Sequence, residues 1–278
     1  MSLHCRNERS EPVQSRKCLL CTIVFCKERM SPVFSLPDKF SYLKDKIEAT
    51  YRPTNILRYT PAKTKPWESK LGGVPYLTSI DDYPKDADGE PMMFLAQIDL
   101  SEMPPLPHFP EKGLLQFYIV NDEDYGYDLP CRVVYIEHFS TNEEELLTEH
   151  PYSEDMDEDV LPYEKECRIH FEQDIMPISS TNDSFDELIG DVTDKNDREE
   201  LYSLLYSAES RMGGYPDFVQ NPVESYESGE KGVLLLQLDC DDEAGLMFGD
   251  SGNCQFFISE EDLKQKDFSD VCYDWACC

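Results

Sequence analysis

Short apolar runs recur along this chain and indicate β-strands. Each run is three to nine residues long and rich in Leu, Ile, Val, Phe and Tyr. Gly, Pro, Asp or Asn stands close to most of the ends, as is typical of strands that are joined by turns. The pattern predicts a β-rich protein. The runs lie at residues 92–100, 114–120, 133–139, 168–171, 233–240, 254–258 and 271–273.

Two other stretches repeat their apolar residues at helical spacing. The first is residues 37–52, which begins with Pro37, a residue suited to a first helical turn. The second is residues 197–210, with Asn196 as its predicted cap. We therefore expect two helices. Their apolar stripes are Phe40, Leu43, Ile47 and Tyr51, and then Leu201, Leu204, Leu205 and Ala208.

A double-glycine motif and the two apolar runs that follow it occur twice. The second set follows the first at offsets of 141, 140 and 139 residues, so the two sets stay in register over about fifty positions. A repeat of this kind predicts an internal duplication. The matched stretches are 71–75 with 212–216, 95–99 with 235–239, and 113–117 with 252–256.

This repeat divides the chain. We expect an α+β, β-rich fold of two internally duplicated halves related by a pseudo-two-fold axis, with a few flanking helices. Both halves are expected to form one globular unit. The expected segments are a basic, cysteine-containing extension at 1–29, a first half at 30–140, an acidic connection at 141–195 and a second half at 196–278.

Polar residues stand at matching places inside the apolar runs. A buried glutamine needs partners for its donors and its acceptor, so these side chains bond the backbone or each other, or they line a pocket between the repeats. The glycines mark places where the backbone needs conformational freedom, and the prolines push the preceding residue into an extended conformation. The candidate ligand-binding residues are Gln97, Asp99, Gln116, Gln237, Asp239 and Gln255. The candidate structural motif is Gly72, Gly73 and Pro75 with Gly213, Gly214 and Pro216.

The charge of the chain is strongly acidic. The formal net charge is −32, and because residues 1–29 carry +3, the other 249 residues carry −35. Such a body repels phosphate backbones and anionic membranes and attracts basic protein faces. We therefore expect a basic protein as partner, with no nucleic acid and no membrane; high solubility alone is the other interpretation.

The eleven cysteines are odd in number and follow no secreted disulfide pattern, so we expect a reducing cytoplasm. A metal site built from His4, Cys5, Cys18, Cys21 and Cys26 is the alternative for the extension, but its spacing is irregular. We predict no metal and no cofactor. Residues 84–95 resemble a calcium loop only in part, because Pro84 stands where the first ligand belongs.

Catalytic motifs are missing from the sequence. It contains no glycine-rich phosphate loop, no G-x-S-x-G elbow and no H-E-x-x-H helix. The five histidines are scattered, and His108 lies in a proline-rich link where a catalytic role stays open. We name no catalytic residue.

Several of these motifs together resemble the YwqG-like family, a bacterial, intracellular domain of unknown function. The resemblance covers residues 35–278 and implies an α+β, β-rich fold. It supplies no catalytic residues. The stretches that carry it are SKLGGVPY at 69–76, YPKDADG at 83–89, LAQID at 95–99, GLLQFY at 113–118, GGYP at 213–216, LQLD at 236–239 and DFSDV at 267–271.

Three functional hypotheses follow. The first is a non-enzymatic binding protein whose acidic surface meets a basic partner, as an immunity-type protein would. The second is a small-ligand or Ca²⁺-binding module that uses the cleft between the repeats. The third is an unrecognised hydrolase. A pocket that holds His or Cys beside a carboxylate would support this hypothesis.

Overall fold

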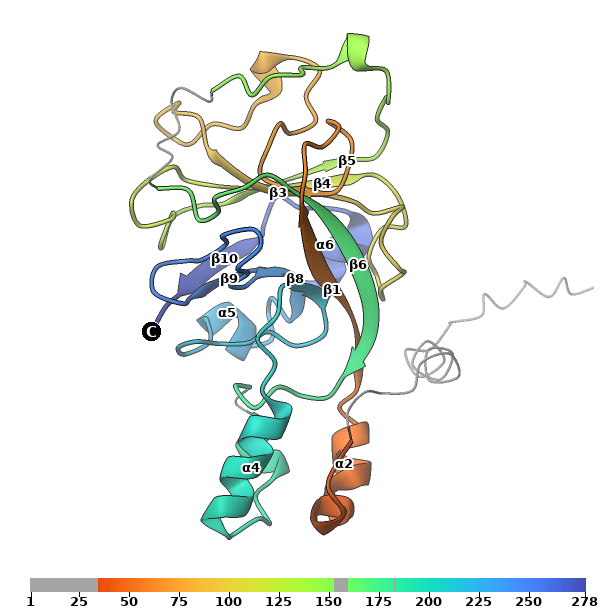
Figure 1. Cartoon of the computed structure of the whole chain (residues 1–278), viewed down its shortest axis with the longest axis vertical. Helices are drawn as coiled ribbons and strands as arrows, with labels where there is room; N and C mark the ends of the chain where they lie inside the picture. Colours follow the sequence, from red (N-terminus) through yellow and green to blue (C-terminus); the bar gives the residue numbers. More distant parts are fainter. Residues whose placement is uncertain (1–34, 153–159, 183) are drawn as a thin grey trace, which may run out of the picture.

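A single ten-stranded antiparallel sheet forms the body of the protein. The computed structural model describes residues 35–152, 160–182 and 184–278. The strand order is β10-β9-β8-β7-β1-β6-β2-β3-β4-β5, and the sheet curls into a half-barrel (Figure 1). The strands are β1 Arg52–Pro61, β2 Lys70–Leu71, β3 Met93–Asp99, β4 Leu114–Ile119, β5 Arg132–Ile136, β6 Cys167–Met176, β7 Arg211–Gly213, β8 Val233–Leu238, β9 Asn253–Ile258 and β10 Cys272–Ala276.

The long strands β1 and β6 lie in the middle of the sheet. They pair over ten residues, from Arg52 opposite Met176 to Pro61 opposite Cys167. The strands β2–β5 continue the sheet from β6, and β7–β10 continue it from β1. We call these two sets the β2–β5 group and the β7–β10 group.

The predicted strands are present; one of them is longer than expected, and the strands β1, β2 and β7 were not predicted. The run at 168–171 is part of the much longer β6. The strand β1 was not predicted, because its residues are mostly polar and Pro53 and Pro61 interrupt the pattern. Half of β1 is nevertheless buried, because β6 and β7 flank it on its two edges.

The two predicted helices are present but shorter than expected. The first begins as a 3-10 turn and ends at Glu48, so residues 49–52 lead into β1 instead of extending the helix. In the second, Asp194 and not Asn196 is the cap, because its side chain accepts from the Asp197 N–H. The helical elements are η1 Asp38–Leu43, α2 Lys44–Glu48, η2 Ile80–Asp82, η3 Glu143–Glu145, α3 Ser184–Leu188, α4 Lys195–Leu205, α5 Glu224–Glu227 and α6 Glu260–Gln265.

The helices α2 and α4 lie side by side at one end of the molecule (Figure 1). Leu43 and Ile47 pack with Leu201 and Leu205 in one apolar cluster. On the outside, Lys39 Nζ lies 2.6 Å from a carboxylate oxygen of Asp197. This small second core closes the end of the sheet.

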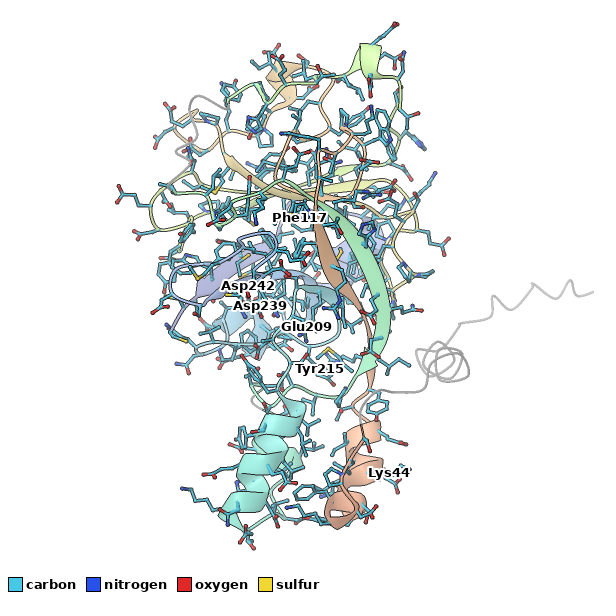
Figure 2. All side chains as sticks on the ribbon, in the orientation of Figure 1. Lys44, Phe117, Glu209, Tyr215, Asp239 and Asp242 are labelled. Atoms are coloured by element: carbon cyan, nitrogen blue, oxygen red, sulfur yellow. The ribbon has the colours of Figure 1, made fainter. Side chains whose placement is uncertain are left out.

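The main core fills the inside of the curled sheet. It contains residues of both strand groups, and Phe117 of β4 meets Phe256 of β9 edge to face with ring centroids 5.1 Å apart (Phe117 is labelled in Figure 2). Burying side chains of this size contributes about 2 kcal/mol each. The inner faces of the two groups therefore pack on each other through apolar contacts.

The two strand groups share their pairing register. Lys70 stands opposite Gln97 in one group, and Arg211 stands opposite Gln237 in the other. The register also shifts at matching places, between Phe94 and Ala96 and between residues 234 and 236. Local backbone geometry thus follows the repeat that the sequence contains.

Some expectations lie outside the described residues. These are the basic extension at 1–29 with its cysteines, and the acidic run at 154–159.

Candidate functional site

The matched glutamines lie on the outer faces of the strand groups. In the first group, the Gln97 side-chain oxygen accepts from the Tyr76 N–H and from Gln116 Nε2, both at 2.9 Å. Gln97 Nε2 donates to the carbonyl oxygens of Pro66 and Glu68 at 2.7 and 3.0 Å. The pair therefore fastens residues 66–76 to the sheet.

The second group repeats this arrangement. The Gln237 side-chain oxygen accepts from the Asp217 N–H at 2.8 Å, and Gln237 Nε2 donates to the Glu209 carbonyl at 2.9 Å. Gln255 Nε2 donates to the Asp217 carbonyl at 2.9 Å. Asp217 and Glu209 stand 141 residues after Tyr76 and Glu68, so the same loop positions are bonded in both groups.

The six predicted ligand-binding residues are not brought together. The glutamines bond within their own strand groups and face away from the shared core. Asp99 accepts from the Ser101 N–H at 2.9 Å, and Asp239 accepts from the Cys240 N–H at 2.8 Å. That these residues bind a ligand stays a prediction; their described hydrogen bonds all go to the chain itself.

The double glycines require left-handed backbone. Gly73 and Gly214 have φ of 74° and 72°, which a residue with a Cβ adopts only at a cost. A Cβ on Gly214 would also lie 2.5 Å from Met176 Sδ, and one on Gly73 would lie 2.6 Å from Glu166 Cδ. Both turns therefore need glycine for conformation and for space.

A buried cation stands two residues before each double glycine. Lys70 is fully buried, and its amine donates to the carbonyls of Lys65 and Val74 at 2.6 and 2.7 Å. Burial lowers the Lys70 pKa to about 7. The amine thus ties together the chain on the two sides of the turn.

Arg211 occupies the same position in the second group. Its guanidinium donates to the carbonyls of Ser207, Glu209 and Tyr215 at 2.5, 3.1 and 3.2 Å (Glu209 and Tyr215 are labelled in Figure 2). Burial lowers the Arg211 pKa, and it raises the pKa of the nearby Asp217 to about 6. The burial of these two cations was not predicted from the sequence. Their matching places, two residues before each double glycine, were the available signal.

A small pocket lies between the two groups, beside Gly213 and Gly214. Its volume is about 210 Å³, and residues of both groups line it, including Leu106 and His108 from the β3–β4 link. His108 has a φ of 69°, and its Nε2 lies 3.2 Å from a carboxylate oxygen of Glu260. A histidine beside a carboxylate in a partly apolar pocket can bind a polar ligand group or move a proton.

A larger pocket of about 610 Å³ lies beside Gly73. His150 and Tyr163 line it, and His150 Nε2 lies 3.2 Å from the Tyr83 hydroxyl. Burial lowers the His150 pKa, so the ring is neutral at pH 7 and can donate or accept a hydrogen bond. Tyr163 donates to the Phe94 carbonyl at 2.9 Å, so its hydroxyl proton is already used.

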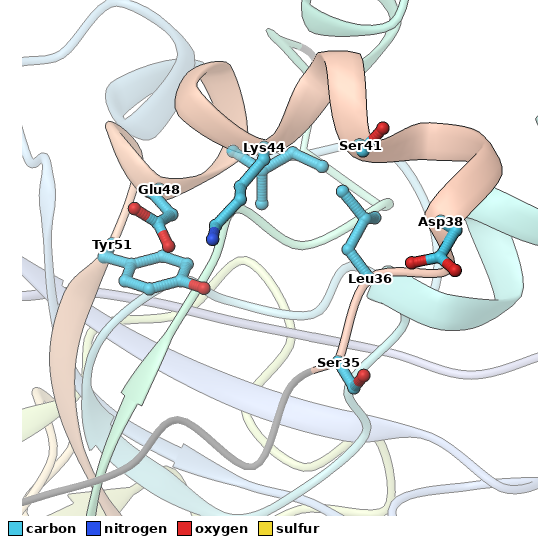
Figure 3. Close-up of a pocket in the computed structure, with 8 residues that line it drawn as sticks. Ser35, Leu36, Asp38, Ser41, Lys44, Glu48 and Tyr51 are labelled. Carbon is cyan, nitrogen blue, oxygen red and sulfur yellow. The ribbon is translucent and has the colours of Figure 1, made fainter.

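A third hollow, of about 390 Å³, lies against α2 (Figure 3). The Lys44 amine points toward Glu48 and Tyr51. Ser35 and Leu36 line one side of it, directly after the part of the chain that the structure leaves undescribed. This hollow carries no functional assignment.

The surface has far more carboxylates than cations. The described residues include 48 Asp and Glu but only nineteen Lys and Arg. Eleven of these nineteen already have a carboxylate within 4.0 Å. Most cations are therefore neutralised locally, and the remaining carboxylates set the sign of the surface field.

Within the described ranges, no group of three or more His, Cys, Asp or Glu side chains is arranged to hold a metal ion. The same ranges contain no helix that is long and apolar enough to cross a membrane.

A comparison with protein-family models gives a match. The model of a protein family described as "Domain of unknown function (DUF1963)" matches residues 69–277. This region starts immediately before Lys70 and contains both double glycines and both strand groups. No curated protein matches the chain.

Proposed function

The chain belongs to this family of unknown function, and we propose that it is a non-enzymatic binding protein whose acidic surface meets a basic protein partner. The observation that carries the proposal is the acidic balance of the described residues, which include 48 Asp and Glu but only nineteen Lys and Arg. A surface of one sign speeds the encounter with a partner of the opposite sign and rejects partners of the same sign. An immunity-type protein that neutralises a basic toxin fits this description, and the cytoplasm is the proposed location.

The proposal includes the origin of the framework. We infer that the two strand groups arose by duplication and that the chain falls within the YwqG-like part of the family. The matched registers and the matched bonds to Tyr76 and Asp217 support the duplication. Since these shared features hold the backbone, they leave the surface free to carry the binding function.

Affinity capture tests the binding function. The protein is immobilised, exposed to lysate of its source organism at low salt and eluted by raising salt, beside an unrelated protein of equal net charge. We expect one basic protein in stoichiometric amount from this chain alone, with an affinity for the purified protein that falls as salt rises. Retention of the same proteins on both columns, or an affinity that salt leaves unchanged, contradicts the proposal.

A ligand in the cleft between the groups is the second candidate. The pocket at His108 and Glu260 favours it, because residues of both groups line this pocket and its two titratable groups face each other at 3.2 Å. A bound ligand raises the melting temperature. The test is a thermal screen of metabolites and of Ca²⁺ on the wild type and on His108→Asn, since Asn tolerates positive φ. A hit shared by both proteins, or no hit, counts against this pocket.

A further inference from the structure

Exposed apolar side chains lie on two loops beside β10. Tyr127 and Leu129 lie on the loop between β4 and β5, and Met247 lies on the link between β8 and β9; they are 59%, 43% and 49% exposed. Trp275 of β10 is half-buried, and its ring lies 6.4 Å from that of Tyr127. The buried Phe248, next to Met247 in the chain, has its ring 6.4 Å from that of Trp275, so this link also passes beside β10. We call Tyr127, Leu129 and Trp275 the aromatic patch.

The aromatic patch is held in place by the surrounding backbone. Trp275 Nε1 donates to the Asp124 carbonyl at 2.7 Å, and the Tyr273 hydroxyl donates to the Tyr125 carbonyl at 2.9 Å. The Tyr125 ring meets Trp275 edge to face at 5.1 Å. Rings that are fixed before binding lose little conformational freedom on contact with a partner, which favours affinity.

Carboxylates are exposed on the loops beside this patch, and these loops contain no cation of their own. Residues 121–131, 241–258 and 267–278 contain neither lysine nor arginine. Glu123, Asp124 and Asp128 are exposed on the loop of Tyr127, and Asp250 is exposed on the link of Met247. An apolar centre with an acidic rim complements a partner with the opposite arrangement.

We propose that the aromatic patch is the docking surface for a protein segment that bears lysine or arginine beside an aromatic or aliphatic anchor. The proposal rests on the acidic binding function above and names its surface. The rings of Tyr127 and Trp275 offer faces to an apolar anchor or to a guanidinium, and the acidic rim pairs with the flanking cations. A second copy of this chain is disfavoured as the occupant, because the same carboxylates would face each other.

Trp275 provides a direct reporter of docking. The chain has only two tryptophans, so a Trp67→Phe protein reports Trp275 alone. The probes are three synthetic peptides of equal length: one with alternating arginine and leucine, one in which serine replaces each leucine, and one in which glutamate replaces each arginine. We expect the arginine–leucine peptide to bind tightest, to change the Trp275 emission and to weaken as salt rises; the glutamate peptide should not bind.

Variants separate the patch from the rest of the acidic surface. In the Trp67→Phe protein, Tyr127→Ser with Leu129→Ser should weaken the arginine–leucine peptide at least tenfold, and Glu123→Gln with Asp128→Asn should weaken it about two- to tenfold. The matched controls are Tyr42→Ser with Ile80→Ser and Glu224→Gln with Glu227→Gln, which change exposed side chains elsewhere. These controls should bind as the parent does.

The outcomes distinguish the two proposals. Salt-sensitive binding that responds equally to patch and control variants, or that leaves the Trp275 emission unchanged, overturns the docking surface and leaves the acidic binding function standing. Failure of both arginine peptides to bind, together with an affinity capture that retains nothing specific, overturns both.

Discussion

Lys70 and Arg211 occupy matching places, yet they hold their turns differently. The Lys70 amine reaches two carbonyl oxygens, whereas the Arg211 guanidinium reaches three. Lysine is a compact point charge that loses its proton when buried, while arginine keeps its charge and spreads several donors in a plane. The same structural task is therefore performed by a titratable group in one strand group and by a permanently charged one in the other.

This comparison separates framework from function. Features that the two groups share, such as the glutamines and double glycines, bond or space the backbone. Features to which both groups contribute side by side, such as the His108 pocket and the aromatic patch, face a cavity or the solvent. These features thus point to where the binding function resides.

The largest expected loss of stability follows from replacing the buried side chains Arg211 and Lys70. Arg211→Met leaves three carbonyl oxygens without this donor and should lower the free energy of unfolding by about 4 kcal/mol. Lys70→Met leaves only two carbonyl oxygens without a donor, and it also removes a buried amine whose desolvation is unfavourable. It should therefore lower the free energy of unfolding by only about 2 kcal/mol. Urea denaturation measures both. Equal losses, or a larger loss for Lys70→Met, would show that the number of carbonyl contacts does not set the cost.

The next largest expected effect is the loss of stability when a glycine of a turn is replaced by alanine. Gly214→Ala should cost about 3 kcal/mol, since its Cβ meets the buried Met176 as well as needing positive φ. Gly73→Ala should cost less, about 2 kcal/mol, because its Cβ meets the end of the partly exposed Glu166 side chain, which can shift at the expense of its hydrogen bonds to Thr64. Gly89→Ala isolates the backbone cost of about 1 kcal/mol, since no atom lies within 4 Å of its Cβ. Thermal denaturation measures the three losses of stability. A larger loss for Gly89→Ala than for the other two variants would contradict this account.

The glutamines should behave alike. Gln97→Met and Gln237→Met each leave a loop N–H and at least one loop carbonyl without their partner, so each should cost about 2 kcal/mol. Hydrogen exchange should increase at Tyr76 in the first variant and at Asp217 in the second. Exchange that rises at neither amide would mean that these bonds do not fasten the loops.

The smallest effect is a dependence on pH that Lys70 confers and Arg211 does not. The folded Lys70 pKa is about 7 against an ordinary value of 10.5, so between these values the unfolded chain binds a proton that the folded chain lacks. Stability should therefore rise with pH across this window, by at most about 1.4 kcal/mol per pH unit. Urea denaturation at pH 7 and at pH 8, below the range where the cysteines ionise, should show a more positive slope for the wild type than for Lys70→Met and Lys70→Arg. Identical slopes for all three would contradict a lowered Lys70 pKa.

Much of the sheet could be predicted from sequence, because apolar strands such as those at Gln97 and Gln237 carry their own pattern. The strand β1 could not, because its burial comes from neighbours far away in the chain. The structural roles of Lys70 and Arg211 could not be predicted, because lysine and arginine side chains are normally exposed. The His108 pocket was hidden for another reason: the sheet must curl before the β3–β4 link reaches Glu260.

The most direct test of the separation between framework and binding surface is the affinity of Gln237→Met for the arginine–leucine peptide, measured where the variant is fully folded. This account predicts a less stable protein with the wild-type affinity, because the Gln237 side chain bonds only the backbone of its own strand group. A folded variant that binds the peptide tenfold more weakly would contradict it and would place the matched glutamines in the binding site.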